Sequence, residues 1–442
     1  MVALTLTGGI GGDLRKLLYN YGRDNDVITV TYDPVAYPYQ ILTVSGADRI
    51  NLQNANTGNT HSVYSGSGRD SIFGGAGVEY IFDQSGNDLF TLRGGTDGYY
   101  SGKGNDTVNG GAGADTINFI YVFDDKNNGI VNTRGVTCDL AKTGVQNFGV
   151  FGNDRISGFD NSFGSNGADQ MYGTSEANKL YGNSGNDLLI GRAGIDELLG
   201  NAGKDKLLGG TGADFLDGGD GHDRLLGDRG ADTLLGQIGN DVIFGGSGAD
   251  DLAGMQGDDT LTGGAGIDFL EGFEGDDRLM GGAAGDSLFG GVGNDFLMGG
   301  AGADYLNADQ DSDRLAGGRG ADTIVLVELT AARDIIIFNR LSDSSIGTVA
   351  GTIDEIRYFD QGGLATDDKI DLRAIDANPN KAGNQAFLFR GTGNFTAPSG
   401  EVRLVESGGN TLVRVDIDGD GRSEMNFLVQ GVIGLTAGDF FL

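Results

Sequence analysis

An aspartate recurs every nine residues, without a miss, from Asp187 to Asp322. Glycines lie five and two residues before most of these aspartates, and a leucine or isoleucine lies two residues after each one. Glycine permits backbone conformations that turn carbonyl oxygens inward, and carboxylate and carbonyl oxygens suit a hard cation of calcium size. The spacing therefore predicts a long series of calcium sites.

A shorter run of acidic residues with the same nine-residue spacing precedes this main run, and Asp154 and Asp169 lie between the two runs. Three departures weaken individual sites, because Ala284 replaces a glycine, Ala308-Asp309-Gln310-Asp311 replaces a whole turn and Glu79 replaces an aspartate. The expected calcium ligands in the two runs are Asp70, Asp88, Asp97, Asp106, Asp115, Asp187, Asp196, Asp205, Asp214, Asp223, Asp232, Asp241, Asp250, Asp259, Asp268, Asp277, Asp286, Asp295, Asp304 and Asp322.

Each nine-residue unit divides into a glycine-rich turn and a three-residue strand whose central leucine is buried. Two units make one coil of eighteen residues, and stacked coils form two parallel sheets around a leucine seam. The expected fold is all-β, a right-handed parallel β-roll in two repeat blocks with a mixed β cap at the C-terminus. Ordering nine glycine-rich residues costs more free energy than one buried leucine returns, so we expect calcium to be the folding switch.

The repeat resembles the GGxGxDxUx nonapeptide of RTX proteins, whose repeats bind Ca²⁺ in a parallel β-helix. The resemblance implies that each ion is shared between turns one coil apart, so that aspartates pair eighteen residues apart. The main run would hold about 14 ions and the earlier run about 4, roughly 18 Ca²⁺ in all. Roughly 18 ions bring about +36 against a formal charge of −33, which leaves the loaded protein near neutrality and free to associate.

The segment from 326 to 442 resembles the C-terminal domain of serralysin-type secreted proteins. The resemblance rests on Asp334-Ile335-Ile336-Ile337-Phe338, Asp368-Lys369-Ile370-Asp371-Leu372, Ala374-Ile375-Asp376-Ala377-Asn378, Gly383-Asn384-Gln385-Ala386-Phe387 and the ending Leu435-Thr436-Ala437-Gly438-Asp439-Phe440-Phe441-Leu442. It implies a cap on the roll and an uncleaved signal read by type I export machinery. We therefore expect a secreted protein, extracellular or at the cell surface, although Met1 to Gly9 shows no cleavable signal.

Asp416-x-Asp418-x-Asp420-Gly421 looks like the start of an EF-hand calcium loop. The loop's Glu at position twelve is absent, because Phe427 stands there. Two interpretations are open. The three aspartates hold calcium, or they form an acidic hairpin turn.

Composition excludes several classes of function. Asp plus Glu number 63 against 30 Lys plus Arg, which disfavours nucleic acid and anionic membranes, and no run of 18 apolar residues predicts membrane insertion. The two histidines, His61 and His222, are too few for a three-histidine zinc motif, and no Gly-x-Ser-x-Gly elbow occurs. We expect no enzymatic activity.

The expected organisation has five parts: an N-terminal cap or anchor at 1–42, a first RTX block at 43–118, a spacer excursion at 119–148, the main block at 149–325 and the C-terminal cap at 326–442. We interpret Cys138, in the spacer, as a substitution at a core position of a strand. In the first part, Asp13 would cap a short helix with Leu14, Leu17, Leu18 and Tyr21 on one face, and residues 26–32 read as a strand. The alternative is an anchor whose Arg15, Lys16 and Arg23 face cell-surface polysaccharide phosphates.

Outward side chains distinguish the functions that remain. One face of the main block carries a nearly unbroken apolar row, consisting of Ile190, Leu208, Leu226, Phe244, Thr262, Met280, Met298 and Ala316. Polar residues interrupt the other face, which reads Leu199, Asp217, Leu235, Ala253, Glu271, Phe289, Asn307 and Val325. Long exposed apolar rows mark contact surfaces, so we expect self-assembly into a surface layer or matrix. The alternatives are a calcium-dependent adhesin and a soluble secreted effector without enzymatic activity.

Overall fold

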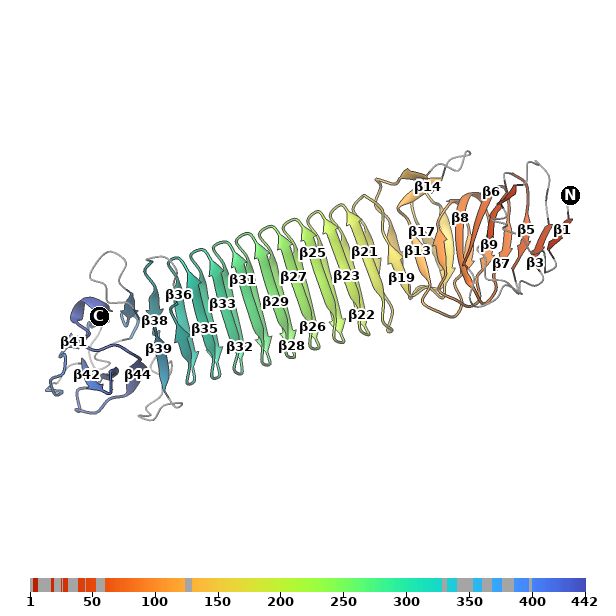
Figure 1. The fold of residues 1–442 in the computed structure, drawn as a ribbon. Helices are drawn as coiled ribbons and strands as arrows, with labels where there is room; N and C mark the ends of the chain where they lie inside the picture. Colours follow the sequence, from red (N-terminus) through yellow and green to blue (C-terminus); the bar gives the residue numbers. More distant parts are fainter. Residues whose placement is uncertain are drawn as a thin grey trace, which may run out of the picture. The chain divides into compact units, whose positions relative to one another are not determined.

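The computed structural model describes residues 3–6, 17–19, 25, 27–30, 39–43, 45–52, 60–123, 129–327, 332–339, 353–359, 368–375, 385–396 and 400–442. The chain divides into two compact units, residues 1–220 and 221–442. Each is built almost wholly of short β-strands that pair in parallel, and Figure 1 shows them as two layers in each unit. The all-β, parallel β-solenoid architecture predicted from the repeat is confirmed. Within the described residues, no helix has the length and apolar character needed to cross a membrane.

In the first unit, one sheet extends unbroken through the coils. Its strands are β2 (Leu17–Tyr19), β4 (Tyr39–Leu42), β6 (Thr60–Ser67), β8 (Val78–Gly86), β10 (Gly98–Tyr100), β13 (Thr116–Asn118), β19 (Asn161–Phe163), β21 (Lys179–Ser184), β23 (Glu197–Ala202) and β25 (Phe215–Asp220), and β11 (Lys103–Gly104) extends the pairing with β8. The predicted helix is wrong for Leu17 and Leu18, which lie in β2 and pair in parallel with β4. Its other residues, the strand ends at Asp26 and Tyr32, and the three basic anchor residues lie outside the described residues.

The opposite layer of the first unit consists of two sheets. The first contains β1 (Ala3–Leu6), β3 (Val27–Val30), β5 (Arg49–Asn51), β7 (Ser71–Phe73), β9 (Leu89–Thr91), β12 (Thr107–Asn109) and β18 (Asn153–Ser157), and the antiparallel β17 (Val145–Asn147) closes it. The second contains β16 (Thr137–Asp139), β20 (Gln170–Tyr172), β22 (Leu188–Ala193) and β24 (Lys206–Thr211). Between them the chain leaves the roll through the antiparallel pair β14 (Tyr121–Phe123) and β15 (Gly129–Val131). Cys138 is fully buried in β16, and burial raises the pKa of its thiol to about 12.

In the second unit, the eighteen-residue register is regular. One layer contains β26 (Arg224–Arg229), β28 (Val242–Ser247), β30 (Thr260–Ala265), β32 (Arg278–Ala283), β34 (Phe296–Ala301), β36 (Arg314–Arg319), β38 (Ile335–Ile337), β40 (Lys369–Asp371) and β45 (Phe440–Phe441). The other contains β27 (Thr233–Ile238), β29 (Asp251–Gln256), β31 (Phe269–Glu274), β33 (Ser287–Val292), β35 (Tyr305–Gln310), β37 (Thr323–Val325) and β39 (Asp354–Arg357). The central leucine or isoleucine of each repeat strand, from Leu225 to Ile324, is at most 1% exposed and forms the core.

The C-terminal segment extends both layers and then changes to antiparallel pairing. β44 (Met425–Val429) pairs in parallel with β39 and antiparallel with β43 (Asn410–Asp416), which forms a hairpin with β42 (Glu401–Ser407). β41 (Leu388–Phe389) pairs with β42, and a short 3-10 turn (Ala437–Asp439) precedes β45. Asp439 accepts a hydrogen bond from the backbone N–H of Thr436 at this turn. The segment is a mixed β structure, as its sequence predicts.

Candidate calcium-binding turns

The repeat aspartates stack in two columns in each unit, one residue per coil. In the second unit, the backbone N–H of Asp241 donates to Oδ1 of Asp259 at 2.7 Å, and Asp259 donates in the same way to Asp277. The other column repeats the contact, with Asp250 donating to Asp268 at 3.0 Å. Every repeat aspartate, at nine-residue intervals from Asp187 to Asp322, is at most 3% exposed. One carboxylate oxygen of each stacked residue therefore has a backbone donor in the coil before it.

The second carboxylate oxygen, Oδ2, has no hydrogen-bond partner in many of these residues. It is buried and unpartnered in Asp187, Asp196, Asp241, Asp250, Asp259, Asp268, Asp277, Asp286, Asp295 and Asp304. A buried carboxylate oxygen without a partner carries a large desolvation penalty. These oxygens therefore need a ligand that the described residues do not supply.

The glycine five residues before each aspartate makes room for that ligand. A Cβ at Gly254 would lie 2.4 Å from Oδ2 of Asp259 and 2.9 Å from the carbonyl oxygen of Gly272, one coil further on. Gly245 has the same surroundings, with Oδ2 of Asp250 at 2.5 Å. A carboxylate oxygen and a carbonyl oxygen thus converge on a space that only glycine leaves open. These oxygen donors fit Ca²⁺.

The glycine two residues before each aspartate has a different role, which is to let neighbouring coils touch. Gly248 has a φ of +143°, and a Cβ there would lie 1.3 Å from the carbonyl oxygen of Gly230 in the preceding coil. No residue with a side chain fits this contact. The two glycines of the repeat therefore serve the fold and the ligand space separately.

Stacking also raises the pKa of the carboxyls. Burial, opposed by a backbone hydrogen bond, raises the pKa of Asp187 and of Asp259 to about 8, and neighbouring aspartates in the column add to the shift. The pKa of Asp286 and of Asp295 rises to about 7 for the same reasons. Each carboxylate in the column is therefore stabilised by a bound cation or a bound proton.

The earlier run forms the same columns. Asp70, Asp88, Asp106 and Asp154 follow one another through backbone donors at 2.7–2.8 Å, although 48 residues separate the last two. Glu79, Asp97 and Asp115 form the second column. The excursion between β13 and β18 therefore leaves the column unbroken, and Glu79 occupies an aspartate position with its side chain fully buried.

Several column members were left out of the expected calcium ligands, although Asp154, Asp169 and Asp313 belong to the pattern described from the sequence. Asp313 accepts from Asp295 at 2.7 Å and lies in the column although Ala308 fills its glycine position. Both columns continue past the main run. The backbone N–H of Asp313 donates to Asp334, that of Asp334 donates to Asp368, and that of Asp322 donates to Asp354. The signal was present in the sequence, because each of these three later aspartates stands two residues before a buried isoleucine, at Ile336, Ile356 and Ile370. The column members left out of the expected ligands are Asp48, Asp154, Asp169, Asp313, Asp334, Asp354 and Asp368.

Comparison with known families agrees with this geometry. The model of the RTX calcium-binding nonapeptide repeat matches residues 64–99, 73–108, 93–119, 163–198, 199–234, 226–261, 253–288 and 289–324. The chain contains RTX calcium-binding repeats. The matched RTX segments coincide with both aspartate runs, and the spacer between them is unmatched.

Among solved structures, the chain is similar to the solution structure of the AlgE6R3 subunit of a mannuronan C5-epimerase from Azotobacter vinelandii. The two are 27% identical over 38% of this chain and 77% of the other, with a TM-score of 0.16. No curated protein matches the chain.

The acidic turn between β43 and β44 brings the three expected ligands together. Asp416, Asp418, Asp420 and Glu424 each place an oxygen within 4.8 Å of the others. Both oxygens of Asp416 also accept backbone N–H groups, from Gly419 and Gly421. Glu424 is an addition to the expected set. Phe427 is fully buried and its ring stacks on Phe338, so the EF-hand's twelfth position serves the core here. Both the calcium and the hairpin-turn interpretations stay open.

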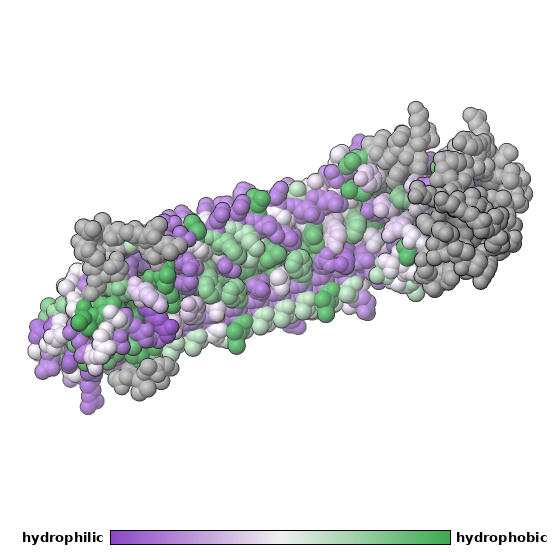
Figure 2. All heavy atoms as spheres, in the orientation of Figure 1, coloured by the Kyte–Doolittle hydropathy of each residue, from purple (hydrophilic) through white to green (hydrophobic). Residues whose placement is uncertain are grey.

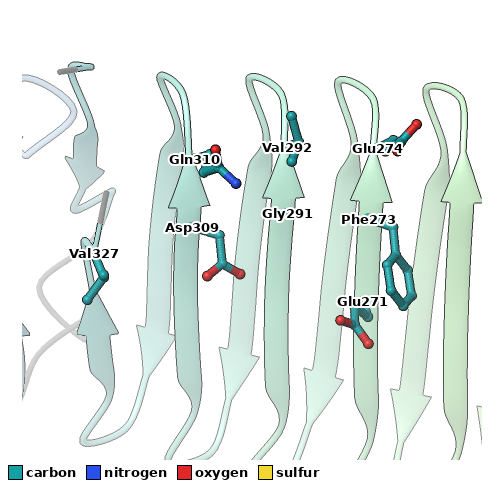
Figure 3. A pocket seen from close by; sticks show the side chains of 8 residues that line it. All are labelled: Glu271, Phe273, Glu274, Gly291, Val292, Asp309, Gln310 and Val327. Carbon is teal, nitrogen blue, oxygen red and sulfur yellow. The ribbon is translucent and has the colours of Figure 1, made fainter. Parts of the chain in front are cut away.

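A shallow pocket of about 490 Å³ opens on the outer surface of the β31–β33–β35 layer. Gly291 has no side chain, so a gap opens between Phe273 on one side and Asp309 on the other (Figure 3). Burial and the nearby Asp309 raise the pKa of Glu271, which also lines this gap. The turn at Asp309 keeps the six-residue strand of the repeat, with Asp309 and Asp311 at positive φ. The pocket lies outside the aspartate columns.

Proposed function

We propose that this protein is exported and folds on extracellular calcium. The observation that carries the proposal is the stacked columns of buried carboxylates, each with a backbone donor on one oxygen and a glycine-lined space at the other. Chelation would leave these columns as rows of buried like charges, which favours the unfolded chain. RTX repeats are typical of secreted proteins, and low cytosolic calcium would keep the chain unfolded until export.

The ion count belongs to this proposal. Roughly 18 Ca²⁺ would neutralise the formal charge of −33, taking one ion for each pair of aspartates one coil apart. Export by type I machinery through the C-terminal segment, and an N-terminal contact with cell-surface polysaccharide, are further parts of it. We propose no catalytic role and no nucleic-acid or membrane partner.

We further propose that the loaded protein assembles with copies of itself, in a surface layer or matrix. Support comes from the outer face of the β28–β34 layer, where Phe244, Thr262, Met280 and Met298 stand in register on successive strands and are half-buried. The guanidinium of Arg224 lies 4.7 Å from the ring centroid of Phe244. Apolar side chains lie among polar ones on the visible face of the molecule (Figure 2). Near-neutral charge after calcium loading would remove the repulsion between copies.

A calcium-dependent adhesin is the alternative, and a specific observation favours it. On the opposite face three aromatic side chains lie together. The ring centroid of Phe289 lies 5.2 Å from that of Phe269 and 5.7 Å from that of Tyr305. Phe269 is 41% exposed. Exposed aromatic rings on a rigid sheet bind apolar or sugar surfaces without further ordering.

The test is a calcium titration of metal-stripped protein, followed by far-UV circular dichroism and light scattering, with negative-stain imaging at the end. We expect a β signal and ordered sheets or filaments to appear with calcium. In the variants Phe244→Asp and Met280→Asp, the β signal should persist while assembly is lost. Ser287→Asp places the same charge on the opposite layer and should assemble normally. Folding to a monomer that never assembles would instead favour the adhesin, and folding without calcium would refute the first proposal.

A further inference from the structure

The first block contains an internal carboxylate that the RTX repeat does not explain. In the main run, the position five residues before each aspartate is glycine, except at Ala308. In the first block this position is Ser65, Asp83 and Ser101 in three alternate units, eighteen residues apart. All three side chains are fully buried. A carboxylate therefore occupies a position where the repeat otherwise leaves open space.

Asp83 is not alone in that space. One carboxylate oxygen each of Asp83, Asp88 and Asp106 lies within 4.8 Å of the other two, and these side chains are at most 3% exposed. The hydroxyl of Ser65 donates to Oδ1 of Asp83 at 2.8 Å. The Tyr99 hydroxyl lies 3.2 Å from Oδ2 of Asp83 and 3.3 Å from Oδ2 of Asp106, and its single proton serves only one of them.

Two further buried oxygens at this place have no partner. One is Oδ2 of Asp88, and the other is the Oγ of Ser101. The pairs Tyr100–Phe82 and Lys103–Ser85 place Ser101 beside Asp83 in the register, on the side opposite Ser65. The Asp83 carboxylate packs directly against Gly102, where a Cβ would lie 2.4 Å from its Oδ2. Three buried carboxylates and an unpartnered hydroxyl thus face a place with too few hydrogen-bond donors.

We propose that Asp83, Asp88 and Asp106 hold an additional divalent cation, Ca²⁺, inside the first block. The site has only oxygen donors, a high negative charge and no imidazole or thiol, which favours a hard cation. It differs from the turn sites of the main run because Asp83 supplies a carboxylate where those sites have glycine, while Asp88 and Asp106 also belong to the aspartate column. Loading would fix β8 to the starts of β9 and β12 through one ion, in the block where leucine gives way to isoleucine, phenylalanine and tyrosine in the core.

The test uses the full chain with Tb³⁺ in place of Ca²⁺ and excitation of tyrosine. Tyr99 lies against two of the carboxylates, so we expect it to sensitise terbium emission from this site. Asp83→Asn and Tyr99→Phe should each remove the same component of that emission. Asp83→Asn should also lower the number of Ca²⁺ bound per chain by one at neutral pH. Asp251→Asn removes an exposed aspartate on β29 and should change neither quantity.

Asp83→Gly is a second variant in case Asp83→Asn fails to fold, because glycine is the residue that the repeat has at this position. It should keep the far-UV signal in calcium while losing the Tyr99-dependent emission. Unchanged emission in both Asp83 variants, together with an unchanged ion count in Asp83→Asn, would overturn the proposal and identify the cluster as a protonated hydrogen-bonded group. This outcome is separate from failure of calcium-dependent folding, which is measured on the unsubstituted chain.

Discussion

Filling the space beside one turn aspartate tests the calcium geometry directly. In Gly254→Ala, the new methyl group would lie 2.4 Å from Oδ2 of Asp259 and 2.9 Å from the carbonyl oxygen of Gly272. Carbon atoms essentially never come so close to oxygen, so the carboxylate must leave the place where it would hold the ion. Gly254 is outside the positive-φ region, so alanine introduces no backbone strain there. The substitution therefore acts mainly on the ligand space.

The expected loss of folding free energy in Gly254→Ala depends on the free calcium concentration. A site contributes about 2.7 kcal/mol when the free ion is at 100 times its dissociation constant, and almost nothing well below it. For a unit of 222 residues, that loss lowers the melting temperature by roughly 5–10 °C. The gap between wild type and variant should widen as calcium rises.

Melting of the far-UV β signal at several calcium concentrations measures this gap, and hydrogen exchange across β29 to β31 locates it. Gly144→Ala is the control, because a methyl group there meets no atom within 4 Å. It should melt like wild type at every calcium concentration. A deficit in Gly254→Ala that is the same at all calcium concentrations would mean a purely steric effect, and would refute the assignment of Oδ2 as a ligand.

Three other outcomes follow from the same geometry. Gly248→Ala should lose roughly 3 kcal/mol or more at every calcium concentration, because its methyl group would lie 1.3 Å from a carbonyl oxygen; a calcium-dependent loss in melting experiments would contradict this. Ala308→Gly should open the space beside Asp313 and raise the bound calcium by one ion in equilibrium dialysis, and an unchanged count would exclude that site. Metal-stripped protein should gain β signal on acidification. Folding raises the pKa of Asp187 and Asp259 from about 3.9 to about 8, so the metal-free fold binds protons. Its stability should be greatest at and below about pH 4 and fall progressively as pH rises from about 4 to about 8, and a titration showing the opposite trend would refute the shifts.

The main block was predictable because one local rule repeats. Every nine-residue unit contains its own turn glycines, its own core leucine and its own aspartate, so the coil follows without knowledge of distant residues. The N-terminal segment has no such rule. Leu17 and Leu18 have helical spacing with their neighbours, yet they form a parallel strand because β4 offers a partner 23 residues further along. Tertiary pairing decided a segment whose local pattern was ambiguous.

The aspartate columns were predictable only where the period holds. The excursion after β13 and the longer loops beyond Asp313 change the spacing from 18 to 48, 21 and 34 residues. Counting residues fails there, although each coil still begins with an aspartate two residues before a buried aliphatic side chain. Asp83 was missed for the opposite reason. It keeps the period but occupies a glycine position, and only the structure shows that its side chain points into the roll beside two column members.

If the proposed function is correct, calcium is part of the fold rather than an addition to it. Each repeat buries one aliphatic side chain and one carboxylate, so the core contains about as many potential charges as apolar anchors. The backbone satisfies Oδ1 through the coil before, but the glycine five residues before each aspartate, which lies against Oδ2, has no side chain that could satisfy that oxygen. Substituting that glycine to supply a donor would fill the same space. The described residues around Oδ2 of Asp241, Asp250 and Asp259 thus offer these oxygens no hydrogen-bond donor, and a cation would complete the columns without leaving a buried charge.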